Sequence, residues 1–142
     1  MAATITEHRL KDRTAHRGVT FASRAFAVAG VYGILALAPQ YFMEGKLGRD
    51  YPPPITHPEH FYGFVGLALV WQVLFLMIAK DPIRYRPVMP VAILEKLSWG
   101  LPCIILYAQG RLAPAILAVG LIDLSLGVLF ALCYRATAPA AR

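Results

Sequence analysis

Two acidic residues and one lysine interrupt long apolar stretches of this 142-residue sequence. Glu95 and Lys96 lie within VAILEKLSW at residues 91–99, and Asp123 lies within an apolar run further along the chain. A charged side chain at bilayer depth costs about 2.5–3.5 kcal/mol on insertion scales, so each of these residues needs a partner, a cavity or a function. If the protein is an enzyme, Glu95 and Asp123 are the candidate catalytic residues, one acting as acid and the other as base.

The composition predicts that these stretches cross a membrane. Hydrophobic residues make up 58% of the chain and charged residues 15%, whereas a soluble domain carries about 25% charged residues. Each of four apolar runs is close to the ~20 residues that span a bilayer. The predicted spans are 25–43, 61–79, 88–109 and 113–134.

The arrangement of the spans follows from the loops and the charges. Short loops favour antiparallel neighbours, so we predict an all-α fold, an integral membrane antiparallel four-helix bundle over residues 25–134. Basic residues gather before the first span, between the second and third, and after the fourth, which predicts that both termini are cytoplasmic. The flanking parts are then a basic cytoplasmic N-terminal segment, 1–24, and a short cytoplasmic tail, 135–142.

A signal peptide is the alternative interpretation of the first span. Basic residues lead into the apolar run, and Ala36-Leu37-Ala38 has the small-x-small form of a cleavage site. Pro39 would follow the cut directly, and the run continues through Tyr41, Phe42 and Met43. We therefore expect an uncleaved first helix.

One polar residue from each predicted span falls near the same depth in the bilayer, given a rise of ~1.5 Å per residue. These residues are Tyr32, Gln72, Glu95 and Asp123. Polar groups at one depth can face a shared interior and satisfy one another, whereas scattered ones would face lipid at a cost. The sequence therefore predicts a polar cluster near the middle of the membrane.

Lys96 and two tryptophans extend this predicted cluster. Because Lys96 lies about 100° round the helix from Glu95, it either snorkels toward the cytoplasm or pairs with Asp123 across a helix interface. Trp99 is one turn from Glu95 on the same helix face. A purely structural polar network that fixes helix register is the alternative to a ligand site. The candidate ligand-binding residues are Tyr32, Trp71, Gln72, Lys96 and Trp99.

The loop before the second span carries a different set of polar residues, in YPPPITHPEHFYGF at 51–64. Thr56 and Glu59 have the spacing of a helix capping box, and Pro58 suits the first helical turn. His57, Glu59 and His60 are also possible metal ligands, but no second His or Cys cluster completes a tetrahedral site on that side. We favour the cap over the metal and predict no cofactor.

The formal charge of +6 does not indicate a nucleic-acid partner. Nearly all of it lies in the flanks and one short loop beside apolar spans, where the positive-inside rule and anionic lipid account for it. We predict membrane lipid as the main partner and no nucleic acid. A lipid-soluble small molecule, a second copy of the chain or a larger membrane complex are the further partners that we consider.

Several motifs resemble those of known membrane proteins. The HPEHFYGF start of the second span, the Trp71-Gln72 pair and the Asp81-Pro82-x-Arg84 turn resemble small bacterial inner-membrane proteins of the DoxX-like kind. The resemblance covers residues 20–135 and implies a multi-pass protein of the bacterial inner membrane. Some members of that group are linked to membrane oxidoreductases, but no catalytic motif transfers residue by residue.

A second resemblance is to the emopamil-binding-protein-like fold, whose buried acidic residues serve sterol isomerisation or ligand binding. Gln72, Glu95, Trp99 and Asp123 would supply the matching chemistry here. The order of that family's motifs is not reproduced, so this resemblance implies only an alternative.

Three classes of function therefore stay open. The preferred one is a small membrane protein that binds an apolar or lipid-like ligand, or a membrane partner, at the polar cluster. The second is an enzyme that uses Glu95 and Asp123 as an acid/base pair on a lipid-soluble substrate such as a quinone or isoprenoid. The third is a proton-coupled transporter, which would act as an oligomer.

Overall fold

The computed structural model describes residues 2–139, with side-chain surroundings for residues 13 and 15–139. Parts of the predicted N-terminal segment 1–24 and of the predicted tail 135–142 thus lie outside the described residues. The described chain contains helices and no strand. In order, the elements are α1 (Ala2–Leu37), η1 (Ala38–Phe42), α2 (Glu44–Asp50), α3 (Pro58–Lys80), η2 (Arg86–Val88), α4 (Met89–Ala108) and α5 (Pro114–Ala136).

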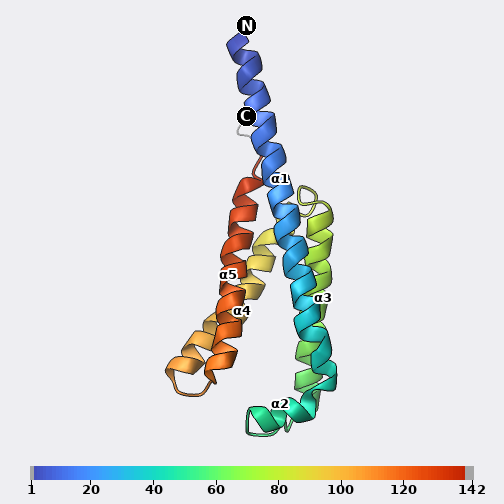
Figure 1. Cartoon of the computed structure of the whole chain (residues 1–142), viewed down its shortest axis with the longest axis vertical. Helices are drawn as coiled ribbons and strands as arrows, with labels where there is room; N and C mark the ends of the chain where they lie inside the picture. Colours follow the sequence, from blue (N-terminus) through green and yellow to red (C-terminus); the bar gives the residue numbers. More distant parts are fainter. Residues whose placement is uncertain (1, 140–142) are drawn as a thin grey trace.

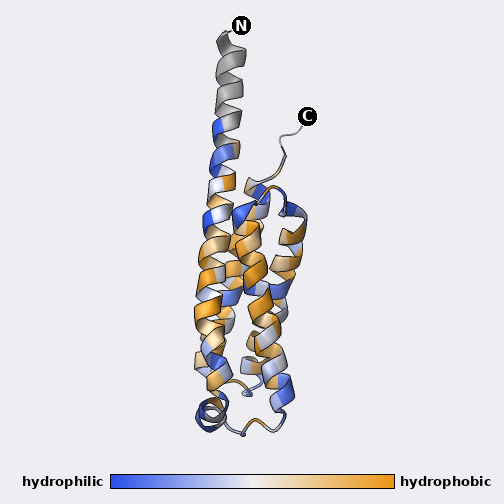
Figure 2. Cartoon of the chain, turned by 90° about the vertical axis from the view of Figure 1, so that its right-hand side faces the viewer, coloured by the Kyte–Doolittle hydropathy of each residue, from blue (hydrophilic) through white to orange (hydrophobic). Residues whose placement is uncertain are grey.

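Four helical segments are long and apolar enough to cross a membrane: Ala15–Phe42, Pro58–Lys80, Arg86–Ala108 and Pro114–Ala136. The predicted all-α class is therefore confirmed for the described residues, and the four apolar helices are compatible with a small multi-pass membrane protein. Figure 2 shows hydrophobic residues covering the middle of the helices, with hydrophilic residues gathered toward both ends. In Figure 1 successive long helices run in opposite directions, and α1 extends beyond the others.

The first helix differs from the predicted span at both ends. It begins well before residue 25, and no proline interrupts it before Pro39. Its α-helical part ends at Leu37, where Pro39 lies in the first positions of the 3₁₀ helix η1. The chain then forms α2, a short helix that we did not predict, and Tyr62 Oη donates to Glu44 Oε2 at 2.8 Å to hold α2 against α3.

The start of α3 also corrects a prediction. His57, and not Thr56, occupies the N-cap position, and no side-chain hydrogen bond caps the helix. Instead, His57 Nδ1 lies 3.2 Å from Glu59 Oε1. The predicted capping box is therefore wrong, although Pro58 does occupy the first turn as expected.

The helices pack as two pairs that join through α1 and α5. Helix α1 packs along α3 and against α5, and α4 packs along α5, whereas α3 and α4 make few contacts with each other. Figure 1 shows the two pairs spreading apart toward the end that carries α2. This division leaves space between the pairs.

Three fully buried phenylalanines join α1, α3 and α5 at the closed end of the molecule. Phe26 stacks on Phe130 with ring centroids 4.1 Å apart, and Phe75 meets Phe130 edge-on at 5.0 Å. Buried aromatic pairs contribute about 0.5–1.5 kcal/mol each beyond the area that they bury. This aromatic core fixes how α1, α3 and α5 approach one another.

Helices α4 and α5 approach closely at Gly120. A Cβ atom at Gly120 would lie 2.6 Å from Cys103 Cβ, which is closer than real Cβ atoms come to one another. Small residues allow membrane helices to pack backbone to backbone in this way. The close contact of α4 and α5 holds Lys96 and Asp123 near each other.

Candidate ligand-binding cavity

A cavity of about 410 Å³ lies between the α1–α3 pair and the α4–α5 pair. Small-molecule sites usually have volumes of about 300–1,000 Å³. All the long helices contribute to the wall, and Met43 and Leu47 extend it toward α2. Most of the wall is apolar. Its polar members are Tyr32, Gln40, Gln72, Glu95, Lys96, Trp99 and Asp123.

A buried cluster of three charged residues forms one part of the cavity wall. Lys96 Nζ on α4 lies 3.2 Å from Asp123 Oδ1 on α5 and 3.3 Å from Glu95 Oε2. The Lys96 side chain is only 5% exposed, and those of Glu95 and Asp123 are 16% and 17% exposed. The sequence analysis left two possibilities for Lys96: a side chain that snorkels toward the cytoplasm, or a pair with Asp123. In the structure Lys96 pairs with Asp123.

The hydrogen bonds of this charged cluster are incomplete. Lys96 donates to Asp123 Oδ1, but Glu95 Oε2 is buried without a hydrogen-bond partner, because its contact with Lys96 is an ion pair without hydrogen-bond geometry. The cluster also contains two acidic groups and one basic group. It can therefore accept a further hydrogen bond and a further positive charge.

Gln72 reaches the cavity from α3. It is 2% exposed, and its Nε2 donates to the Ala68 carbonyl oxygen at 2.9 Å. Its Oε1 occupies the space beside Gly33 of α1, where a Cβ atom would lie 2.0 Å away. The absence of a side chain at Gly33 thus makes room for Gln72 at the α1–α3 interface.

Aromatic side chains line the rest of the predicted cluster. Trp99 of α4 and Phe64 of α3 both line the cavity, with ring centroids 5.3 Å apart, and so partly close the gap between the helix pairs. Tyr32 also lines the cavity and is 40% exposed. Trp71 departs from the sequence prediction: it is absent from the cavity wall, and its ring packs 6.3 Å from that of Phe75.

Sequence reasoning missed most of the apolar wall. On α1, Ala29, Gly33 and Ala36 line the cavity beside Tyr32. Their spacing of four and three residues places three small residues on one helix face. This pattern can be seen in the sequence and could have predicted that this face of α1 lines the cavity. On α5 the apolar members are Ile116, Val119 and Leu126, and their sequence context does not distinguish them from lipid-facing neighbours.

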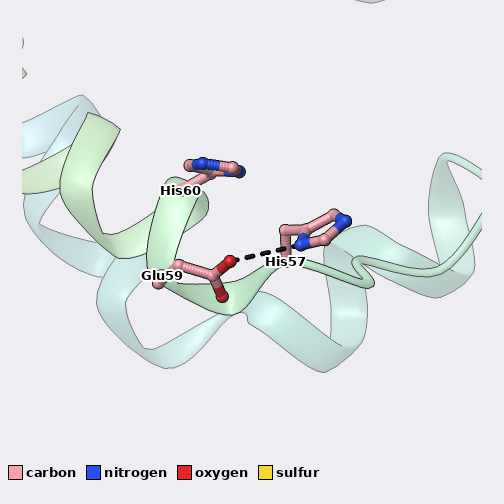
Figure 3. Close-up of side chains that lie close together, drawn as sticks. All are labelled: His57, Glu59 and His60. Atoms are coloured by element: carbon pink, nitrogen blue, oxygen red, sulfur yellow. Dashed lines mark hydrogen bonds and ion pairs between the residues drawn. The ribbon is translucent and has the colours of Figure 1, made fainter.

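The three possible metal ligands lie away from the cavity wall, at the start of α3. His57, Glu59 and His60 are exposed, and their potential ligand atoms all lie within 4.8 Å of one another. Figure 3 shows the Glu59 carboxylate directed at the His57 ring, with His60 on the same turn. The sequence analysis favoured a helix cap formed by Thr56 and Glu59 over a metal site, and that cap does not form.

Comparison with known proteins finds no matching family model, no matching curated protein and no matching solved structure. The resemblance to DoxX-like proteins therefore stays a prediction from the motifs.

Proposed function

We propose that this chain is a small multi-pass membrane protein that binds a lipid-like molecule in the cavity between its two helix pairs. The observation that supports this most is the buried charged cluster of Glu95, Lys96 and Asp123 on the wall of a mostly apolar cavity. Interhelical polar contacts in membranes contribute only ~0.6 kcal/mol on average. Two buried acidic groups are therefore a costly way to fix helix register, and a binding role accounts for them better.

The cavity walls suggest an elongated amphiphile as the ligand. Apolar residues, among them Phe64, Met43 and Leu47, line the part that extends toward α2 and would hold an apolar tail. The polar end would lie against Glu95 and Asp123, which together exceed the single positive charge of Lys96. An excess negative charge in a low-dielectric site favours a cationic partner. We therefore propose that the polar end of the ligand is a protonated amine.

The geometry favours binding over acid/base catalysis. Both candidate catalytic carboxylates contact the same ammonium group, so both lie at one side of the cavity. An acid/base pair needs both groups within hydrogen-bond reach of the substrate's reacting atoms, and here both carboxylates are already engaged by Lys96. The proposed role of Glu95 and Asp123 is accordingly to bind the polar end of a ligand, with Lys96 holding them in place.

We further propose that the four spans form an antiparallel bundle in a bacterial inner membrane, with both termini in the cytoplasm. The end of α3, the loop that follows it and the end of α5 carry basic residues, including Lys80, Arg84 and Arg135. The positive-inside rule places these segments on the cytoplasmic side. The histidine-containing start of α3 would then face the opposite side.

Mass spectrometry of small molecules that co-purify with the protein in lipid nanodiscs tests the binding role. We expect the wild type to retain a long-chain amine or amine-bearing lipid that Glu95→Gln and Asp123→Asn lose. The matched control is Ser125→Ala, because Ser125 lies on the same helix as Asp123, is exposed, and donates to the Leu121 carbonyl oxygen of its own helix. Equal retention of every compound by the wild type and both acid variants would contradict the proposal.

A further inference from the structure

We propose that His57, Glu59 and His60 form a binding site for a divalent transition-metal ion at the start of α3. This site is separate from the cavity, and its existence does not depend on the proposed ligand. The chemical class that fits the three side chains is a late first-row ion such as Zn²⁺, for which imidazole nitrogens and a carboxylate oxygen are common ligands.

The three side chains are already close to the arrangement that one ion requires. One possible ligand atom from each residue lies within 4.8 Å of the others. His57 Nδ1 and Glu59 Oε1 are 3.2 Å apart, and the two imidazole rings have centroids 5.4 Å apart. With metal–ligand bonds of about 2.0–2.2 Å, tetrahedral ligand atoms lie roughly 3.3 Å from one another. Only side-chain rotations are therefore needed, and all three side chains are exposed.

The spacing within α3 supports a shared ion. His57 occupies the N-cap position and His60 follows three residues later, so the two side chains can project from one side of the first turn. Figure 3 shows the Glu59 carboxylate reaching the His57 ring from the same turn. Two imidazoles and one carboxylate leave a coordination position for water, as in three-ligand zinc sites.

The structure does not contain the helix capping box that is the alternative explanation of these polar residues. A capping box would use Thr56 and Glu59, but no side-chain hydrogen bond caps α3. A carboxylate in the first turn also interacts favourably with the helix dipole, which explains Glu59 alone and neither histidine. The 3.2 Å contact of Glu59 Oε1 with His57 Nδ1 already holds two possible ligand atoms at about the separation that a shared ion requires.

Titration of the full-length, tag-free protein in nanodiscs with Zn²⁺ alone, followed by calorimetry, tests this proposal. We expect saturable binding of one ion per chain. His57→Ala and His60→Ala should each weaken Zn²⁺ binding by at least about tenfold. Replacing a residue that only orients a metal ligand already lowers metal affinity about 10–100-fold, and replacing the ligand itself should cost at least as much. The two positions are exposed, so both variants should keep the helical circular dichroism of the wild type.

His16→Ala is the matched control, because His16 is an exposed histidine on α1 outside the three-residue group. It should bind Zn²⁺ as the wild type does. Two results would overturn the proposal: no saturable binding by the wild type, or binding of unchanged affinity in the His57→Ala/His60→Ala double variant. Neither result would bear on the cavity ligand, which is tested with variants of α4 and α5.

Discussion

Lys96 Nζ on α4 lies 3.2 Å from Asp123 Oδ1 on α5, and the lysine side chain is 5% exposed. The same ammonium group contacts Glu95. Lys96 therefore lies between two carboxylates at the α4–α5 interface. All three residues line a cavity whose wall is mainly apolar. This relationship has consequences for both stability and binding.

Replacing the lysine should destabilise the protein more than replacing either acid. Lys96→Met leaves two carboxylates without a cation, and breaking a buried ion pair costs about 3–5 kcal/mol. Asp123→Asn leaves the Lys96–Glu95 pair with balanced charge, so we expect less than half of that loss. Reversible unfolding in mixed micelles gives the free energy of unfolding of each variant.

A neutral cluster provides the control for this prediction. The triple variant Glu95→Gln/Lys96→Met/Asp123→Asn contains no uncompensated charge and should recover most of the stability that Lys96→Met loses. Two results would contradict this account: an equal loss of unfolding free energy in Lys96→Met and Asp123→Asn, or a triple variant that is the least stable of all. Either would mean that Lys96 does not stabilise the protein by balancing the charges of Glu95 and Asp123.

The close approach of α4 and α5 predicts the effect of a methyl group at Gly120. Gly120→Ala places a Cβ atom 2.6 Å from Cys103 Cβ, which no side-chain rotation can relieve. Overpacking of this kind costs about 1–3 kcal/mol. Gly63→Ala is the matched control on α3, because nothing lies within 4 Å of its Cβ position, and it should be neutral or slightly stabilising.

A second substitution, at Cys103, tests whether the contact between positions 120 and 103 causes the loss of stability in Gly120→Ala. Adding Cys103→Gly to Gly120→Ala removes the clashing Cβ and should restore part of the lost stability, whereas adding Cys103→Ala removes only the sulfur, 2.9 Å away, keeps the Cβ at 2.6 Å and should restore less. Both pairs are compared by thermal unfolding in the same detergent. Equal behaviour of the two double variants would show that the α4–α5 contact at Gly120 is not the cause.

The proposed orientation in the membrane predicts which residues a membrane-impermeant maleimide reaches. In intact spheroplasts, Arg49→Cys should be labelled and Arg84→Cys should be labelled only after permeabilisation, because the two positions lie on opposite sides. Both positions are exposed. The wild type is the background control, since its cysteines, Cys103 and Cys133, are buried. The reverse labelling pattern would contradict cytoplasmic termini.

The elements of this fold that depend on length and hydropathy could be predicted from the sequence. Four runs of about 20 apolar residues gave four candidate spans, and Pro58 marked the start of α3 as a first-turn proline. The extension of α1 and the helix α2 could not be predicted in this way. Both lie in polar sequence, where neither span length nor hydrophobic periodicity is informative.

The site was predictable only in its polar members. Polar groups inside apolar spans identified Tyr32, Gln72, Glu95 and Asp123, and the cavity brings all four together. The apolar wall was not predictable, because residues that face lipid and residues that face the protein interior are equally hydrophobic in a membrane helix. Trp71 and Gln72 are consecutive and hence about 100° apart on α3, so only Gln72 faces the cavity.

The most direct test of the central claim uses the two tryptophans of the chain. In Trp71→Phe, Trp99 on the cavity wall is the sole tryptophan fluorophore, and a brominated long-chain amine in nanodiscs should quench it to saturation. That saturable component should disappear when Asp123→Asn is added, and it should be absent in Trp99→Phe, where only Trp71 reports. Quenching that rises linearly with the amine, and equally with Asp123 present or replaced, would mean that the probe only dissolves in the bilayer and that the cavity does not bind it.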